Sequence, residues 1–200
     1  MDTDTVWQHI DTERSRLADL LESLPPAAWD HSSLCQGWSV RDVGAHLTFA
    51  HARGRDIVWP AIRTGFRYNA IIDYTARHSP VSHEQIVAIL RGFVASRRRA
   101  PFVTELEPLI DILVHSQDIC VPLGIEYPIP VEAAVAAADR VLSTRAPMRL
   151  WEPPRGVRLV ATDADWAFGR GTVREAPMQS HLLTLTGRQS TSADAIRNTR

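Results

Sequence analysis

The chain has 200 residues, a formal net charge of −1 and two cysteines. This length suits one medium-sized domain, or one domain with a small appendage, and excludes a large multidomain architecture. The balanced charge and a calculated pI of about 6.7 provide no basic surface for nucleic acid or anionic membranes. All 22 basic residues are arginine, which excludes Schiff-base and phosphate-loop chemistry because both require lysine.

The sequence also indicates the compartment and the class of partner. No apolar run reaches the roughly 18 residues that a membrane-spanning helix needs, and the N-terminus lacks the basic and apolar regions of a signal peptide. Cys35 and Cys120 belong to no Cys-x-x-Cys motif, so two reduced thiols are expected. We therefore expect a cytoplasmic protein, monomeric or homodimeric, that acts on small molecules and not on nucleic acids or membranes.

Four helical segments are predicted before residue 125, from capping signals followed by apolar residues at helical spacing. The predicted segments run from Thr5 to about Leu24, from Ser39 with interruptions toward Tyr74, from Ser82 to the arginines at 97–99, and from Leu106 to Val121. Gly124 supplies an end to the fourth, and an Ala-rich helix follows from Val131 to about Leu142. An antiparallel four-helix bundle is the simplest architecture for these segments.

The sequence changes character after residue 146. Residues 156–162 alternate between apolar and polar side chains, and Gly169-Arg170-Gly171 supplies turn residues before a further short strand. Pro177 then starts a short helix that ends at Gly187. We predict a mainly α (α+β) protein, with a metal-binding helical bundle over 1–146, a small β-hairpin plus helix over 147–188, and a polar tail over 189–200 that is disordered.

Chemistry-bearing residues gather in the fourth predicted helix. Asp111, His115 and Asp118 stand at i, i+4 and i+7, so they form one stripe on a helix that is apolar over most of its remaining circumference. Charges buried in such a helix must be paired or must bind a metal. The alternative, that the stripe is the solvated side of an amphipathic helix, stays open for this segment taken alone.

His46 lies on the second predicted helix among apolar neighbours, where a lone histidine is ordinarily a satisfied core residue. In helix bundles, however, metals are held by inward histidines and carboxylates from facing helices. His46, Asp111 and His115 would then bind a divalent ion and leave positions open for water or substrate. Zn²⁺ suits this ligand set best, with Ni²⁺ or Fe²⁺ as alternatives. Asp118 would orient a ligand or a loop without contacting the metal.

Two of these segments together resemble a known family. Residues 37–47 (GWSVRDVGAHL) and 111–119 (DILVHSQDI) are similar to the mycothiol-dependent maleylpyruvate isomerases of the DinB/YfiT-like superfamily, and residues 157–188 look like the C-terminal segment common in that family. The resemblance implies a four-helix bundle with a divalent metal at His46, Asp111 and His115. It also implies that the metal works with the small thiol mycothiol in isomerisation or sulfur transfer. The family's isomerases typically carry Glu where this chain has Asp111, whose side chain is one methylene shorter.

These observations predict a metal-dependent transferase or isomerase that uses mycothiol on a small electrophilic substrate. No side chain is assigned as the nucleophile: Cys35 is expected in a polar loop, and Cys120 stands about 180° round the helix from Asp111. The attacking sulfur would then come from the cofactor, as a thiolate stabilised by the metal. Two alternatives stay open, a hydrolase that uses metal-bound hydroxide and a non-catalytic protein that binds a metal or a small molecule.

Overall fold

The computed structural model describes residues 1–51, 54–99, 104–144 and 155–188. The chain divides into two compact units, one of residues 3–127 and one of residues 128–200 together with residues 1–2. The predicted boundary after residue 146 and the predicted tail over 189–200 both lie outside the described residues, so these segment limits stay predictions. Within the described part of the chain, none of the helices combines the length and apolar character needed to cross a bilayer.

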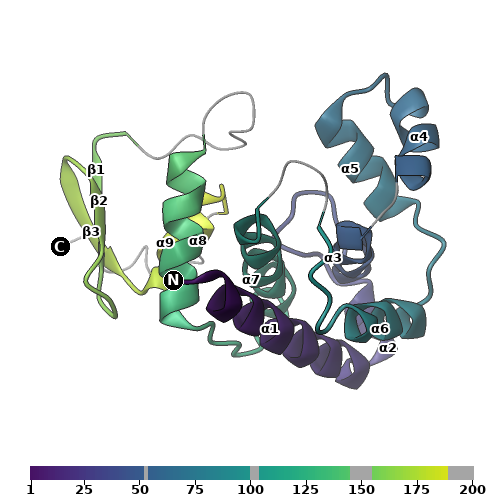
Figure 1. Ribbon diagram of the computed structural model, residues 1–200, viewed down its shortest axis with the longest axis horizontal. Coiled ribbons are helices and arrows are strands. Elements are labelled where there is room, and N and C mark those ends of the chain that lie inside the picture. The colour runs from purple at the N-terminus through teal and green to yellow at the C-terminus, as the bar shows by residue number, and fades with distance from the viewer. Residues whose placement is uncertain (52–53, 100–103, 145–154, 189–200) are drawn as a thin grey trace. The chain divides into compact units, whose positions relative to one another are not determined.

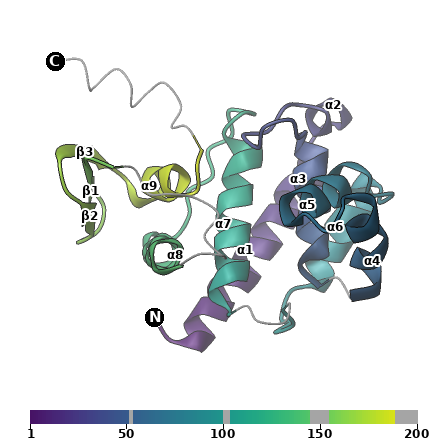
Figure 2. The same cartoon turned by 90° about the horizontal axis from the view of Figure 1, so that it is seen from above.

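Four helices form the core of the first unit. α1 packs against both α6 and α7, and α3 packs against the same two helices, which closes a four-helix bundle (Figure 1). α5 lies beside α3 on the outside of this bundle (Figure 2). The elements of the unit are α1 (Thr3–Ser23), α2 (Pro26–Trp29), α3 (Val40–Leu47), the 3₁₀ turn η1 (Thr48–His51), α4 (Gly54–Arg63), α5 (Tyr68–Arg77), α6 (His83–Gly92) and α7 (Leu106–Cys120). The predicted fold class, mainly helical with a four-helix bundle, is confirmed.

The bundle is held together by apolar side chains spaced at helical intervals. Its fully or almost fully buried members include Ile10, Leu17 and Leu21 on α1, Val43 and Leu47 on α3, Ile86 and Leu90 on α6, and Leu109 and Leu113 on α7. α3 and α6 approach closely at Gly44, where an added Cβ would lie 3.2 Å from Ile86 Cγ2. A glycine at this position therefore sets how near the two helices can come.

The capping signals at the starts of the second and third predicted segments form capping boxes. Ser39 and Asp42 cap α3 reciprocally, and Ser82 and Gln85 cap α6 in the same way. The predicted start of the first segment at Thr5 is wrong in detail, because α1 begins at Thr3. Each box satisfies backbone N–H groups that the first helical turn leaves without a partner.

The predicted ends of two helices are also corrected. α6 stops at Gly92, short of the arginines at 97–99, and Ala95 adopts a left-handed φ of 64°, which a continuing helix cannot include. The buried Arg14 guanidinium of α1 donates to the Phe93 carbonyl at 2.8 Å and to the Ser96 carbonyl at 3.3 Å. The second predicted segment is divided into α3, η1, α4 and α5.

The second unit contains a small sheet and two helices that pack on each other, α8 (Val131–Ser143) and α9 (Met178–Leu185). The strands are β1 (Val157–Ala161), β2 (Ala167–Gly169) and β3 (Thr172–Ala176), in the order β2-β1-β3. The predicted hairpin is β1–β2, and β3 pairs with the other edge of β1 in parallel. Where the chain passes from β2 to β3, glycine is needed at positions 169 and 171. An added Cβ would collide with the carbonyl of Val157 at the first position and with that of Gly156 at the second.

Candidate metal centre

His46, Asp111 and His115 converge, with ligand atoms that all lie within 4.8 Å of one another. Asp111 Oδ1 stands 3.5 Å from His46 Nε2 and 3.3 Å from His115 Nε2. The two imidazoles meet edge to face, with ring centroids 4.8 Å apart and an interplanar angle of 73°. Three potential ligand atoms on two helices therefore surround one point, as the sequence predicts for these residues.

The spacing of these atoms fits a metal ion. Two ligand atoms bound at about 2.0–2.1 Å with tetrahedral angles lie about 3.3–3.4 Å apart, close to the 3.3 and 3.5 Å separations of Asp111 Oδ1 from the two imidazole nitrogens. The shorter Asp111 side chain thus reaches the same point as the two histidines. Imidazole nitrogen and carboxylate oxygen are ligands that Zn²⁺ accepts readily.

The two helices position the ligands through their packing. His46 lies in the last turn of α3, directly before η1, with Ala45 and Leu47 buried on either side. Residues 112–120 of α7 are all buried, so the helix cannot turn about its axis without exposing apolar surface. The side chains of His46 and His115 retain exposures of only 17% and 11%, whereas Asp111 retains 35%. The open side of the site is therefore at Asp111.

The charges of the cluster depend on one another. Partial burial alone would raise the pKa of the Asp111 carboxyl, but the charge of His46 and the hydrogen bond from His115 hold it well below its usual range. Burial alone would lower the pKa of His115, but hydrogen bonds with Asp111, Asp118 and Cys35 raise it well above its usual value. These hydrogen bonds favour the protonated form of His115, and a metal at Nε2 would take the place of the proton on Nε2 while Nδ1 kept its own.

Asp118 lies behind His115, one helical turn further along α7. Its carboxylate is fully buried, and Oδ2 stands 2.7 Å from His115 Nδ1. Because a carboxylate only accepts hydrogen bonds, His115 Nδ1 carries the proton and Nε2 faces Asp111. This is the arrangement in which an outer carboxylate orients a metal-binding imidazole.

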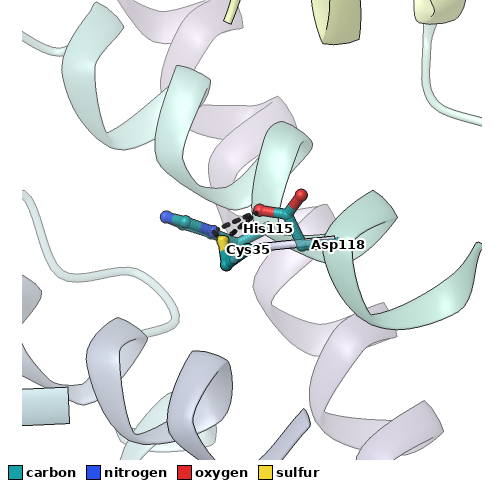
Figure 3. Close-up of side chains that lie close together, drawn as sticks. All are labelled: Cys35, His115 and Asp118. Carbon is teal, nitrogen blue, oxygen red and sulfur yellow. Dashed lines mark hydrogen bonds and ion pairs between the residues drawn. The ribbon is translucent and has the colours of Figure 1, made fainter. Parts of the chain in front are cut away.

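Cys35 contacts the same carboxylate (Figure 3), whereas the sequence predicted only that it lies in a polar loop. Its Sγ lies 3.0 Å from Asp118 Oδ2 and 3.9 Å from His115 Nδ1. The tight turn at 33–38 places it there, with Gly37 at a φ of 77° and the Trp38 N–H donating to the Cys35 carbonyl at 3.0 Å. The residue was missed because loop geometry of this kind has no periodic signature in the sequence.

Cys120 is a different case from Cys35. It is fully buried on α7, and burial raises the pKa of its thiol to about 12 despite the nearby charge of Arg16. A thiol with this pKa is protonated at neutral pH and is a poor nucleophile. The expectation that Cys120 takes no part in the chemistry agrees with this environment.

Trp38 forms one wall beside the cluster. Its ring lies 5.4 Å from the His46 ring, tilted by 54°, and its Nε1–H donates to Asp73 Oδ1 of α5 at 2.9 Å. The other carboxylate oxygen of Asp73, Oδ2, lies 3.9 Å from Nη1 of Arg77. Because Asp73 of α5 accepts this hydrogen bond, α5 helps to hold the Trp38 ring beside His46.

Comparison with known proteins shows that part of the chain is similar to a known family. Residues 10–104 match the family model described as mycothiol maleylpyruvate isomerase N-terminal domain. This match covers just under half of the chain. The resemblance inferred from the sequence is thereby confirmed. The matched segment includes Cys35 and His46 but ends before Asp111 and His115, so the case for the two α7 residues as ligands rests on geometry alone.

Solved structures support the same fold over most of the chain. A mutant of the mycothiol-dependent maleylpyruvate isomerase superposes with a TM-score of 0.63 at 13% identity, covering 95% of this chain and 91% of that chain. A second crystal structure of the mycothiol-dependent maleylpyruvate isomerase gives a TM-score of 0.62 at 16% identity, covering 96% and 91%. At such identity the likeness shows a shared fold. No curated protein sequence matches significantly.

Proposed function

We propose that this protein is a divalent-metal-dependent enzyme that uses mycothiol to isomerise, or transfer sulfur to, a small electrophilic substrate. The observation that carries the proposal is the convergence of His46, Asp111 and His115 within 4.8 Å, in a chain whose residues 10–104 match the isomerase family model. Zn²⁺ is the proposed ion because the set combines two imidazoles with one carboxylate.

Each residue of the cluster has a distinct task in this proposal. His46 and His115 would hold the ion through Nε2, and Asp111 would hold it through Oδ1. When bound, the ion would keep the thiol of mycothiol as a thiolate, which supplies the reversible addition that a cis-to-trans isomerisation needs. Throughout the reaction, His115 would keep its proton on Nδ1, because the buried carboxylate of Asp118 already accepts that hydrogen bond.

The environment of Asp118 favours this route over hydrolysis. A carboxylate free to activate water would favour hydrolysis, but Asp118 is fully buried and accepts hydrogen bonds from His115 and Cys35. Asp42 is engaged in the capping box of α3. These two carboxylates are thus already engaged in other contacts.

The test is an assay of the zinc-loaded protein with mycothiol and maleylpyruvate, the substrate named for the solved isomerases, and then with other small electrophiles. We expect turnover that requires both thiol and metal, and that is lost with the metal in His115→Ala. The double variant Cys35→Ser, Cys120→Ser should retain turnover, because the attacking sulfur is external. Turnover that persists without thiol would favour the hydrolase, and zinc binding without turnover of any electrophile would favour a binding protein.

A further inference from the structure

One oxygen of the Asp118 carboxylate contacts two side chains, those of His115 and Cys35, which lie 80 positions apart in the chain. Oδ2 lies 2.7 Å from His115 Nδ1 and 3.0 Å from Cys35 Sγ (Figure 3). Since an ionised carboxylate is only an acceptor, the Cys35 thiol is the donor in the second contact. A short relay therefore runs from the Cys35 S–H through Asp118 to the imidazole of His115.

This geometry differs from that of a cysteine nucleophile with a histidine base. In such a triad the nucleophile and the orienting carboxylate contact opposite nitrogens of the imidazole. Here Cys35 and Asp118 both approach His115 Nδ1, whereas Nε2 stands 3.3 Å from Asp111 Oδ1. With Nδ1 occupied by its hydrogen bond to Asp118, His115 is not placed to accept the Cys35 proton.

The packing of the first unit holds the three residues of this relay in place. Asp118 has no exposed surface, and a buried carboxylate is costly unless it accepts hydrogen bonds. The Leu34 N–H also donates to the main-chain carbonyl of Asp118 at 3.1 Å, so the turn that carries Cys35 is fastened to α7 at the same residue. The thiol is thereby held where it can restrain rotation of the carboxylate.

We propose that Cys35 is a positioning residue for the metal centre: its thiol fixes the Asp118 carboxylate, which in turn fixes His115 with Nε2 directed at Asp111 and His46. The part of this inference that concerns the metal rests on the proposed function, because that function assigns the ion to these three ligands. The part that concerns the orientation of His115 stands on the hydrogen bonds alone.

The first experiment measures zinc affinity by competition with a chelating dye in the full chain. Cys35→Ala should bind zinc about 10-fold or more weakly, the range found for residues that orient metal ligands. Cys35→Ser should bind nearly as tightly as the parent, because its hydroxyl can donate to Asp118. Cys120→Ala is the matched control and should retain parental affinity, since that thiol has no place in the relay.

A double-mutant cycle tests whether Cys35 acts through Asp118. Asp118→Ala should weaken zinc binding by about 10–100-fold, and adding Cys35→Ala to it should cause little further loss. Residues that work through a shared partner are non-additive in this way. Losses that add fully, or a Cys35→Ser variant as weak as Cys35→Ala, would overturn the proposal. A parent that binds two zinc ions, with one lost in Cys35→Ala, would make Cys35 a metal ligand and would also overturn it.

A second readout needs no metal. In ¹⁵N-labelled metal-free protein, the Nδ1–H resonance of His115 should be protected from exchange in the parent and in Cys35→Ser, and broadened by exchange in Cys35→Ala. If the parent binds no zinc, the proposed function fails, whereas the resonance still tests the positioning role. A Cys35→Ala spectrum identical to that of the parent would refute that role.

Discussion

His51 shows how a single partly buried group can make stability depend on pH. Its ring packs on Phe93 with centroids 3.8 Å apart, and Nε2 is buried without a hydrogen-bond partner among the described residues. Burial, together with the positive charges of Arg14 and Arg98, lowers the pKa of His51 to about 4, against an opposing backbone hydrogen bond. His51 is therefore neutral in the folded protein at neutral pH.

The expected consequence is a loss of stability on mild acidification. Below pH 6.5 the unfolded chain protonates this histidine while the folded chain does not, so the unfolded state gains protons and the free energy of unfolding falls. The loss should stay below about 3 kcal/mol between neutral pH and pH 4, because solvent screens part of the effect at this partly exposed side chain, and it should level off below that. Urea unfolding at several pH values measures it, and His51→Gln should flatten this part of the profile. An unchanged profile in the variant would assign the pH dependence to other groups.

At the same scale, the sequence could predict some site residues and not others. Asp111, His115 and Asp118 share a helix, where spacing fixes direction, and His46 follows a capping signal that locates its helix. Cys35 and Trp38 lie in the turn before α3, and their contacts with Asp118 and Asp73 depend on loop geometry. No periodicity encodes such contacts, so they became visible only in the folded chain.

Among the elements, the contact of α3 with α6 controls the position of His46. Gly44→Val should destabilise the protein by about 1–3 kcal/mol through overpacking against Ile86, and it should also weaken zinc binding because α3 must shift. Gly92→Ala is the matched control: an added Cβ there meets nothing within 4 Å, so a gain of about 0.5–1 kcal/mol is expected.

Urea unfolding and zinc titration of both variants check this prediction. Parental zinc affinity in Gly44→Val, despite lower stability, would show that the packing of α3 does not govern the site.

Elements with strong local signals were predictable, and elements ended by tertiary contacts were not. The caps of α3 and α6, the helix α8 and the strand β1 follow from residues within a few positions of one another. The end of α6 depends instead on Arg14, which donates to carbonyls 79 and 82 positions along the chain. The parallel pairing of β3 with β1 likewise requires the chain to cross β1, which turn residues alone do not specify.

For the whole molecule, metal binding should be coupled to folding. An ion that binds the folded state alone stabilises it by about 2.7 kcal/mol when its free concentration is 100 times Kd. Zinc should therefore raise the free energy of unfolding of the parent by about this amount, and a chelator should reverse the gain. His115→Ala should show no such gain, because the site loses a ligand. An equal gain in that variant would mean that zinc stabilises the protein from elsewhere.

The contact between Cys35 and Asp118 spans 83 positions of the chain, which constrains the order in which the protein matures. During synthesis, the turn that holds Cys35 and the helix that holds His46 leave the ribosome well before α7. Contacts between distant segments form only after the entropy of closing a long loop has been overcome. Neither the relay nor the proposed ligand set can exist until α7 has docked, so metal binding at the proposed site would be a late step, and a chain truncated before α7 would not retain a metal there.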